Sequence, residues 1–221
     1  MSSNGNPAIS LDAQRAAMVE HQLRRRGIRD ERVLAAMSKV PREEFVSPQD
    51  RASSYADHPI AIGEQQTTSQ PYMIAAMLQA AEIKPEDRVL EIGAGSGYQT
   101  ALLAELAREV FAVERYTSLA DSARERLQRM GYTNTTVVAG DGSLGLVQSA
   151  PFDAIIVSAA APHIPQALID QLAPGGRLVI PVGEAQHQIL QLARRWPDGI
   201  KVTSLEPCRF VPLIGEQGFL G

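Results

Sequence analysis

Short apolar runs alternate with stretches of helical periodicity along most of the chain. Runs bounded by polar residues, glycine or proline are typical of buried strands; they lie at residues 89–92, 110–113, 136–139, 152–157 and 177–182. Between them, residues 98–107 and 165–172 carry apolar side chains at helical spacing. This alternation predicts an α/β fold whose mainly parallel, doubly wound sheet has helices on both faces.

The first part of the chain is expected to be helical. An amphipathic stretch at 13–23 runs into three arginines, Arg24 to Arg26, and stops at Gly27, so these cations are expected at a helix C-terminus, which the helix dipole favours. A second short helix is predicted at 30–37 and a third at 73–81. We expect these helices to form an N-terminal segment of the same unit and not a separate domain.

The last part of the chain is expected to differ from the core. Residues 188–193 and 201–211 look like strands with no helix between them, which predicts a terminal antiparallel pair. At 221 residues the chain fits one domain. Within it we distinguish an N-terminal segment with a candidate active serine (1–81), a cofactor-binding core (82–183) and C-terminal strands (184–221).

Composition narrows the class of protein. Hydrophobic residues make up 44% and charged residues 21%, which is typical of a globular protein, and no apolar run is long enough to span a bilayer. The net charge of −4 argues against a nucleic-acid partner. The single cysteine, Cys208, excludes an internal disulfide and a cysteine-cluster metal site, and we expect an inert, partly buried thiol. No secretory leader is visible, so we expect a cytoplasmic monomer without a metal or membrane partner.

A glycine-rich turn follows the first predicted strand. Its glycines stand at 93, 95 and 97, and a predicted helix begins at Tyr98. Glycines let the backbone approach a ligand closely, and the free N–H groups of a helix N-terminus can bind it. A dinucleotide site requires Gly-x-Gly-x-x-Gly, but Tyr98 stands where the third glycine would be. The tighter spacing is that of S-adenosylmethionine-dependent methyltransferases.

Acidic residues lie at the same end of the predicted strands. Glu114 lies about 20 residues beyond the turn, the distance expected of a carboxylate that accepts from both ribose hydroxyls. Asp141, followed by Gly142, ends the third run and could accept from an adenine amino group, while Glu91 lies in the first run. Each acid alone is better explained as a solvated loop residue or a helix cap. Together they favour a nucleoside-type cofactor.

Four segments then resemble one family, the protein-L-isoaspartate (D-aspartate) O-methyltransferases. They are residues 63–73, 152–162, 165–178 and 209–214. The resemblance runs from about residue 18 to residue 214. It implies a Rossmann-like class I methyltransferase fold, with S-adenosyl-L-methionine as cofactor and S-adenosyl-L-homocysteine as product. The implied reaction is methylation of the free α-carboxylate of L-isoaspartyl residues in damaged proteins and peptides, which initiates their repair.

The resemblance also implies individual roles. Ser69 corresponds to the active serine of the family, and the loop over the cofactor is formed by Gln66, Thr67, Thr68 and Ser69. The chain departs from the family at Gln65, where a small residue is usual, at Thr68, where an aliphatic one is usual, and at Ala94, which replaces a common threonine. We expect the first two changes to alter the packing of the loop.

Methylation of a carboxylate requires no general base, because model acidic groups have a pKa near 4 and are already ionised. The site must remove water from the carboxylate and hold it in line with the methyl group without over-stabilising its charge. A hydroxyl can do this with less penalty than a cation, which is the role predicted for Ser69. Because Ser69 precedes Pro71 and a predicted helix, it could also be a helix N-cap.

An isoaspartyl substrate routes its backbone through a side-chain carbonyl. We therefore expect the site to accept an extended, flexible segment, held largely by main-chain hydrogen bonds. The residues predicted to contact it are Ile62, Gly63, Ser69, Tyr72, Val211, Pro212 and Leu213.

Three alternatives stay open. A small-molecule or RNA methyltransferase could share the same core. A nicotinamide-dependent oxidoreductase is disfavoured by Tyr98, and a non-catalytic adenosylmethionine-binding module is disfavoured by the serine segment.

Overall fold

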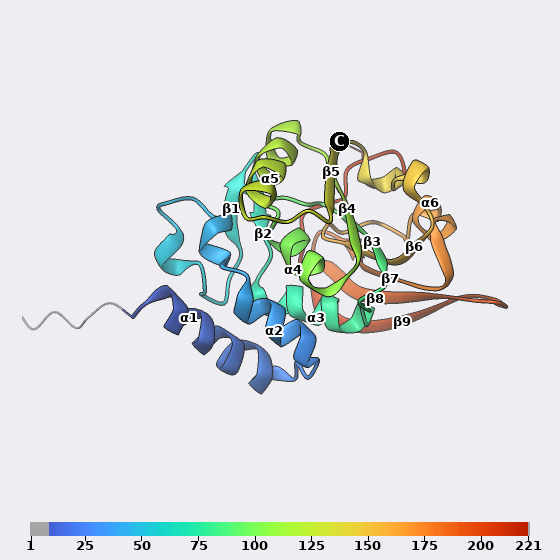
Figure 1. The fold of residues 1–221 in the computed structure, drawn as a ribbon. Helices are drawn as coiled ribbons and strands as arrows, with labels where there is room; N and C mark the ends of the chain where they lie inside the picture. The colour runs from blue at the N-terminus through green and yellow to red at the C-terminus, as the bar shows by residue number, and fades with distance from the viewer. Residues whose placement is uncertain (1–8, 221) are drawn as a thin grey trace, which may run out of the picture.

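A seven-stranded sheet with the strand order β5-β4-β3-β6-β7-β8-β9 forms the centre of the molecule (Figure 1). The computed structural model describes residues 9–220. The strands are β3 (Arg88–Ile92), β4 (Glu109–Glu114), β5 (Thr135–Ala139), β6 (Phe152–Val157), β7 (Leu172–Glu184), β8 (His187–Trp196) and β9 (Gly199–Cys208). Neighbours from β5 to β7 are parallel, and the last two pairings are antiparallel. The predicted Rossmann-like architecture is confirmed.

Helices cover both faces of this sheet. Those that pack on its strands are α3 (Pro71–Ala81), α4 (Tyr98–Leu106), α5 (Thr117–Arg129) and α6 (Gln166–Asp170). The other two, α1 (Leu11–Ala17) and α2 (Glu31–Lys39), belong to the N-terminal segment, and α2 packs on α3 and α4. Successive strand residues point to opposite faces. Val89 and Val110 therefore belong to a core shared with α2 to α5, whereas Leu90 and Phe111 belong to a second core that contains Leu168 of α6.

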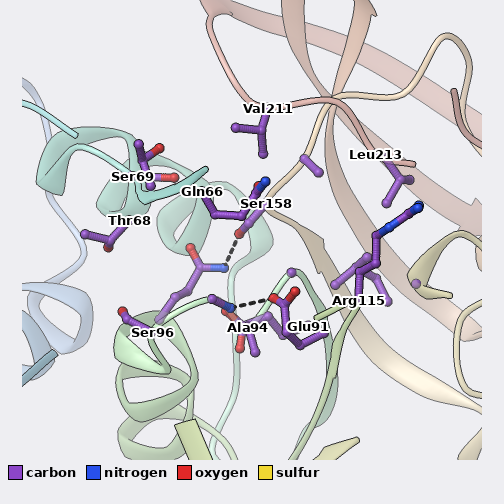
Figure 2. Close-up of a pocket in the computed structure, with 18 of the residues that line it drawn as sticks. Gln66, Thr68, Ser69, Glu91, Ala94, Ser96, Arg115, Ser158, Val211 and Leu213 are labelled. Carbon is purple, nitrogen blue, oxygen red and sulfur yellow. Dashed lines mark hydrogen bonds between the residues drawn. The ribbon is translucent and has the colours of Figure 1, made fainter. Parts of the chain in front are cut away.

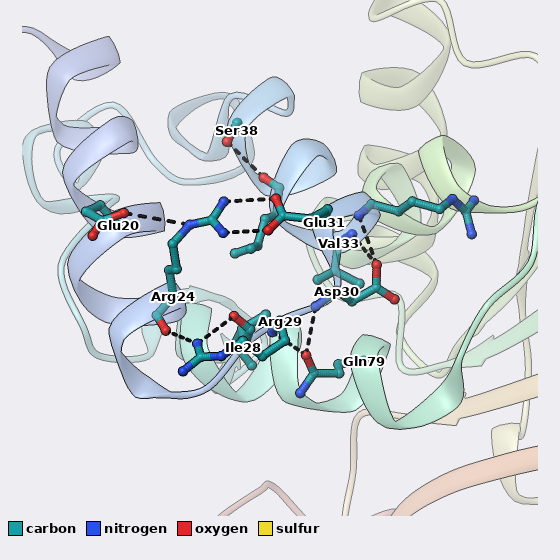
Figure 3. Close-up of polar contacts among 11 residues, drawn as sticks. Glu20, Arg24, Ile28, Arg29, Asp30, Glu31, Val33, Ser38 and Gln79 are labelled. Carbon is teal, nitrogen blue, oxygen red and sulfur yellow. Dashed lines mark hydrogen bonds and ion pairs between the residues drawn. The ribbon is translucent and has the colours of Figure 1, made fainter.

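The N-terminal helices pack on α3 through polar contacts as well as apolar ones (Figure 3). A π-helical turn (Met18–Leu23) and a 3-10 turn (Arg24–Arg26) continue α1, and the helix ends at Gly27, whose φ of 101° only glycine adopts easily. The side-chain oxygen of Gln79 on α3 accepts from the backbone N–H groups of Arg29, at 2.6 Å, and Asp30, at 3.0 Å. Asp30 caps α2, as its sequence position predicts.

Some local predictions were incomplete or wrong. The helix α5 was not predicted, although its buried residues have helical spacing; its other positions are mostly polar. The hairpin of β1 (Ile60–Gly63) and β2 (Gln66–Thr68) was also missed, because its strands are very short. β7 begins at Leu172, earlier than the strand predicted at 177–182, and its pairing with β6 is irregular in this first part. α6 ends at Asp170 and β9 ends at Cys208, each earlier than expected.

The remaining regular segments are short 3-10 turns. They are Arg42–Phe45, Arg51–Ser53, Gly142–Leu144 and Val147–Ser149. Among residues 9–220, no helix has the length and apolar character needed to cross a membrane.

Candidate active site

A cavity, the inner pocket, lies at the carboxyl ends of β3, β4 and β6 (Figure 2). The strand order reverses at β3, and ligands of open α/β sheets bind beside such a reversal. Most residues that the sequence predicted for the site line it. They are Ile62, Gln66, Thr67, Thr68, Ser69, Glu91, Gly93, Gly95, Glu114, Gly142, Val211, Pro212 and Leu213.

A second cavity, the outer pocket, adjoins the first and has a volume of about 840 Å³. Tyr72 and Phe210 contribute to its walls, and so does Arg26, whose guanidinium lies 3.7 Å from the centre of the Tyr72 ring. Cys208 also lines it; the thiol is half-buried, and burial raises its pKa to about 11, so it is protonated at neutral pH. Ser69 lines both pockets.

Two predicted site residues line neither of these pockets. Gly63 faces a separate hollow. The carboxylate of Asp141 accepts from the Ser143 hydroxyl at 2.7 Å and from the Glu216 N–H at 2.8 Å. Although partial burial raises the pKa of Asp141, these hydrogen bonds hold it below its ordinary value. The contact of Asp141 with an adenine group stays a prediction. The next residue, Gly142, does line the inner pocket.

The backbone of the glycine turn allows a ligand to approach it closely. Gly95 has a φ of 53°, and a Cβ at this position would lie only 2.9 Å from Cδ1 of Ile62. The N–H of Gly95 donates to Glu114 at 2.8 Å, and the N–H of Tyr116 donates to the other carboxylate oxygen at 3.0 Å. Glu114 is only 5% exposed, so the end of β4 and the turn after β3 are fixed to each other through one buried carboxylate.

Glu91 is the most buried acid of the inner pocket. It is fully inaccessible, and one oxygen accepts from the Thr100 hydroxyl at 2.6 Å while the other has no partner in the described residues. Burial raises its pKa to about 8, the hydrogen bond from Thr100 opposes this, and nearby Glu114 adds to it. An unpaired buried acceptor beside a second carboxylate fits a ligand that brings positive charge and N–H donors.

This burial predicts a pH dependence of stability. A carboxyl whose pKa is raised from 4.5 to about 8 on folding binds its proton more tightly in the folded state. Its contribution is therefore fully present below about pH 4.5 and is lost as the pH rises toward 8. Between pH 6.5 and 7.5, the wild-type protein is expected to lose about 1 kcal/mol of unfolding free energy relative to Glu91→Gln. Parallel urea titrations of the two proteins would contradict this if their difference did not change with pH.

Arg42 forms a hydrogen bond to the backbone of the segment that carries Ser69. This side chain is fully buried, and its Nη2 donates to the Ser69 carbonyl at 2.9 Å while its Nε donates to the Ser54 carbonyl at 2.8 Å. Burial lowers the pKa of Arg42, and the Tyr98 ring lies 4.9 Å away. The N-cap of α3 is Gln70, not Ser69, so the alternative capping role of Ser69 is not seen. Its hydroxyl is left available to the pockets.

The departures from the family pattern have local explanations. Glu64 and Gln65 both have positive φ, 49° and 56°, and join β1 to β2. Glycine adopts such angles without strain, which accounts for a small residue being usual at Gln65. Thr68 is buried, and its hydroxyl accepts from Nη1 of Arg42 at 3.4 Å. A polar residue here is therefore tolerated because a buried cation reaches it.

Sequence reasoning missed several residues of this region, among them Ser158, Gln99 and Arg42. Ser158 lines both pockets, and Gln99 donates to its hydroxyl oxygen at 2.8 Å. Ser158 could have been found, because it directly follows a predicted strand at the edge where ligands are expected. Nothing in the sequence around Arg42 distinguishes it from an exposed arginine, and the same is true of Gln99 within an apolar helix.

The sheet order, the glycine turn and the acids at the strand ends together define a class I methyltransferase fold with a nucleoside-type cofactor pocket. Among residues 9–220, no three His, Cys, Asp or Glu side chains are grouped to hold a metal ion.

Comparisons narrow the class to one family. The model of the protein-L-isoaspartate(D-aspartate) O-methyltransferase family matches residues 13–218. A protein-L-isoaspartate O-methyltransferase of Koribacter versatilis is 56% identical over 93% of this chain and 92% of its own length. One from Syntrophobacter fumaroxidans is 51% identical over 96% of this chain and 100% of its own length. A Plasmodium falciparum protein of this description, solved in complex with S-adenosyl-L-homocysteine, has a TM-score of 0.78 and 29% identity over 90% of this chain and 97% of its own. The chain belongs to the protein-L-isoaspartate (D-aspartate) O-methyltransferase family.

Proposed function

We propose that this chain transfers the methyl group of S-adenosyl-L-methionine to the free α-carboxylate of L-isoaspartyl residues in damaged proteins and peptides, leaving S-adenosyl-L-homocysteine. Membership of the family supports the reaction. The observation that carries the proposal for the site is the position of Ser69, which lines both the inner and the outer pocket. A cofactor in the first and a peptide in the second would meet at this residue.

The residues of the inner pocket suit this cofactor. Glu114 has the position of a ribose ligand, and Gly93 and Gly95 give the backbone room for a close approach. The buried Glu91, with one unpaired oxygen at the pocket wall, would attract the α-ammonium group. Gln66 to Thr68 form a loop at the wall of the same pocket. When bound, S-adenosyl-L-methionine supplies a methyl group made electrophilic by its sulfonium.

The chain's own residues need to position the substrate and exclude water. The carboxylate is ionised at neutral pH and attacks without a base. Ser69 would orient one carboxylate oxygen through its hydroxyl, while Val211 would exclude water from the junction of the pockets and Leu213 from the inner pocket. The peptide would lie in the outer pocket against Tyr72 and Pro212 as an extended segment. The net charge of −4 favours protein over nucleic acid as partner. One chain lines both pockets, which suits a monomer, and the cytoplasm is its proposed location.

An acceptor survey tests the proposed reaction. Purified protein is incubated with labelled S-adenosyl-L-methionine and either aged protein that has accumulated isoaspartyl sites, freshly made protein, RNA or small carboxylic acids. Label is expected in the aged protein alone, and mild base should release it as methanol, because the product is a methyl ester. Label confined to RNA or to a small acid would instead identify one of the alternative methyltransferases.

Changing Ser69 to alanine is expected to slow methylation without loss of stability. The loss of one positioned hydrogen bond corresponds to about 1–3 kcal/mol of transition-state stabilisation, roughly a 5- to 150-fold lower single-turnover rate. The melting temperature should not change, because Gln70 and not Ser69 is at the N-cap of α3. Ser69→Thr, which keeps a hydroxyl, is the matched control. A destabilised Ser69→Ala variant with a normal rate at low temperature would assign the serine a structural role only.

A further inference from the structure

Two hydroxyl residues besides Ser69, Thr67 and Ser158, lie at the junction of the two pockets. Besides Ser69, Ser158 lines both cavities, and Figure 2 shows the two serines at the same pocket, one before α3 and the other at the end of β6. The backbone of Ser158 is fixed there, because its N–H donates to the Ile92 carbonyl of β3 at 2.8 Å. Ser158 is thus hydrogen-bonded to the central sheet, whereas Ser69 lies between β2 and α3.

The hydroxyl of Ser158 accepts one hydrogen bond, and its own hydrogen is available to a ligand. Its Oγ accepts from Nε2 of Gln99 at 2.8 Å, and within residues 9–220 its own O–H finds no acceptor. Gln99 is itself only 6% exposed on α4, so the geometry of this contact is constrained. A hydroxyl that accepts from an amide becomes a better donor in turn. Ser158 is therefore oriented to donate to an acceptor that arrives from outside the chain.

A carboxylate presents two oxygens, and only one of them attacks the methyl group. The other needs a neutral donor, since a cation would stabilise the charge of the ground state that disappears in the transition state. We propose that Ser158, positioned by Gln99, is the second hydroxyl that binds the substrate carboxylate, opposite Ser69. This inference rests on the proposed function. Val211 and Pro212, which also line both pockets, shield the same position from water.

The test compares Ser158→Ala with Ser158→Thr, which keeps the hydroxyl. For an isoaspartyl peptide, Ser158→Ala is expected to lower kcat/KM about tenfold or more, with KM raised, while the Kd for S-adenosyl-L-homocysteine changes less than about threefold. Ser158→Thr should restore most of the lost kcat/KM. A merely structural role would not produce this separation of peptide kinetics from cofactor affinity.

Several results would overturn the inference. One is an unchanged kcat/KM in Ser158→Ala, and another is an equal loss of affinity for S-adenosyl-L-homocysteine, which would assign the hydroxyl to the cofactor. If the alanine variant is unstable, Ser158→Cys keeps the volume but has only a weak donor, and it should show the same loss. Failure of the wild-type protein to methylate the peptide would refute the proposed function, whereas an active wild type with an unaffected Ser158→Ala refutes only the role of Ser158.

Discussion

Replacing Arg42 with alanine is expected to destabilise the protein by about 3–5 kcal/mol. The guanidinium is fully buried, and its removal leaves the carbonyls of Ser54 and Ser69 without these donors in the interior. It also leaves a cavity beside Tyr98. Each effect is unfavourable, because buried acceptors lose their hydrogen bonds and the surrounding core relaxes only partly.

Urea denaturation of Arg42→Ala and of a volume-matched Arg42→Met variant separates these two effects. The methionine variant fills most of the space but supplies no donor, so it should recover the cavity contribution and still hold Ser69 poorly. Its methylation rate should therefore remain low at a temperature where it is folded. A loss of less than about 1 kcal/mol in Arg42→Ala would show that the carbonyls find other partners.

Replacing Glu114 with alanine is expected to weaken binding of S-adenosyl-L-homocysteine by about 1.5–3 kcal/mol, roughly 10- to 150-fold. An ionised carboxylate that accepts from ribose hydroxyls makes stronger hydrogen bonds than a neutral acceptor. The substitution also frees the N–H groups of Gly95 and Tyr116, which Glu114 now holds. Part of the loss should therefore come from a less ordered turn.

Glu114→Gln is the matched variant, since it keeps the shape and one acceptor oxygen. Its affinity should lie between those of the wild type and Glu114→Ala in titration calorimetry. Melting curves of the same preparations report whether the proteins are folded. An unchanged affinity in a folded Glu114→Ala protein would remove Glu114 from the ribose site.

The hydrophobic pattern was sufficient to predict the sheet and the edge at which the site lies. Each parallel strand contains an apolar run, the glycine turn directly follows β3, and Glu114 is the last residue of β4, so the local sequence was enough to place them. The helix α5 was not predicted because most of its residues are polar. The hairpin of β1 and β2 was not predicted because its turn has positive φ angles and its strands lack apolar alternation.

Contacts between distant segments could not be predicted from the sequence. The carboxylate of Asp141 accepts from Glu216, 75 residues further along the chain. Arg42 reaches Ser69 across 27 residues, and Gln99 reaches Ser158 across 59. Such partners depend on how the loops fold over the sheet, which single-sequence patterns do not encode.

The most direct measurement uses two synthetic peptides that differ only in the linkage of one residue, aspartyl in one and L-isoaspartyl in the other. Both are incubated with the protein and labelled S-adenosyl-L-methionine. The account predicts that only the isoaspartyl peptide gains label and that base removes it, because the ester lies next to a backbone amide that can close to a succinimide. Equal labelling of the two peptides, or a base-stable product, would contradict methylation of the isoaspartyl α-carboxylate.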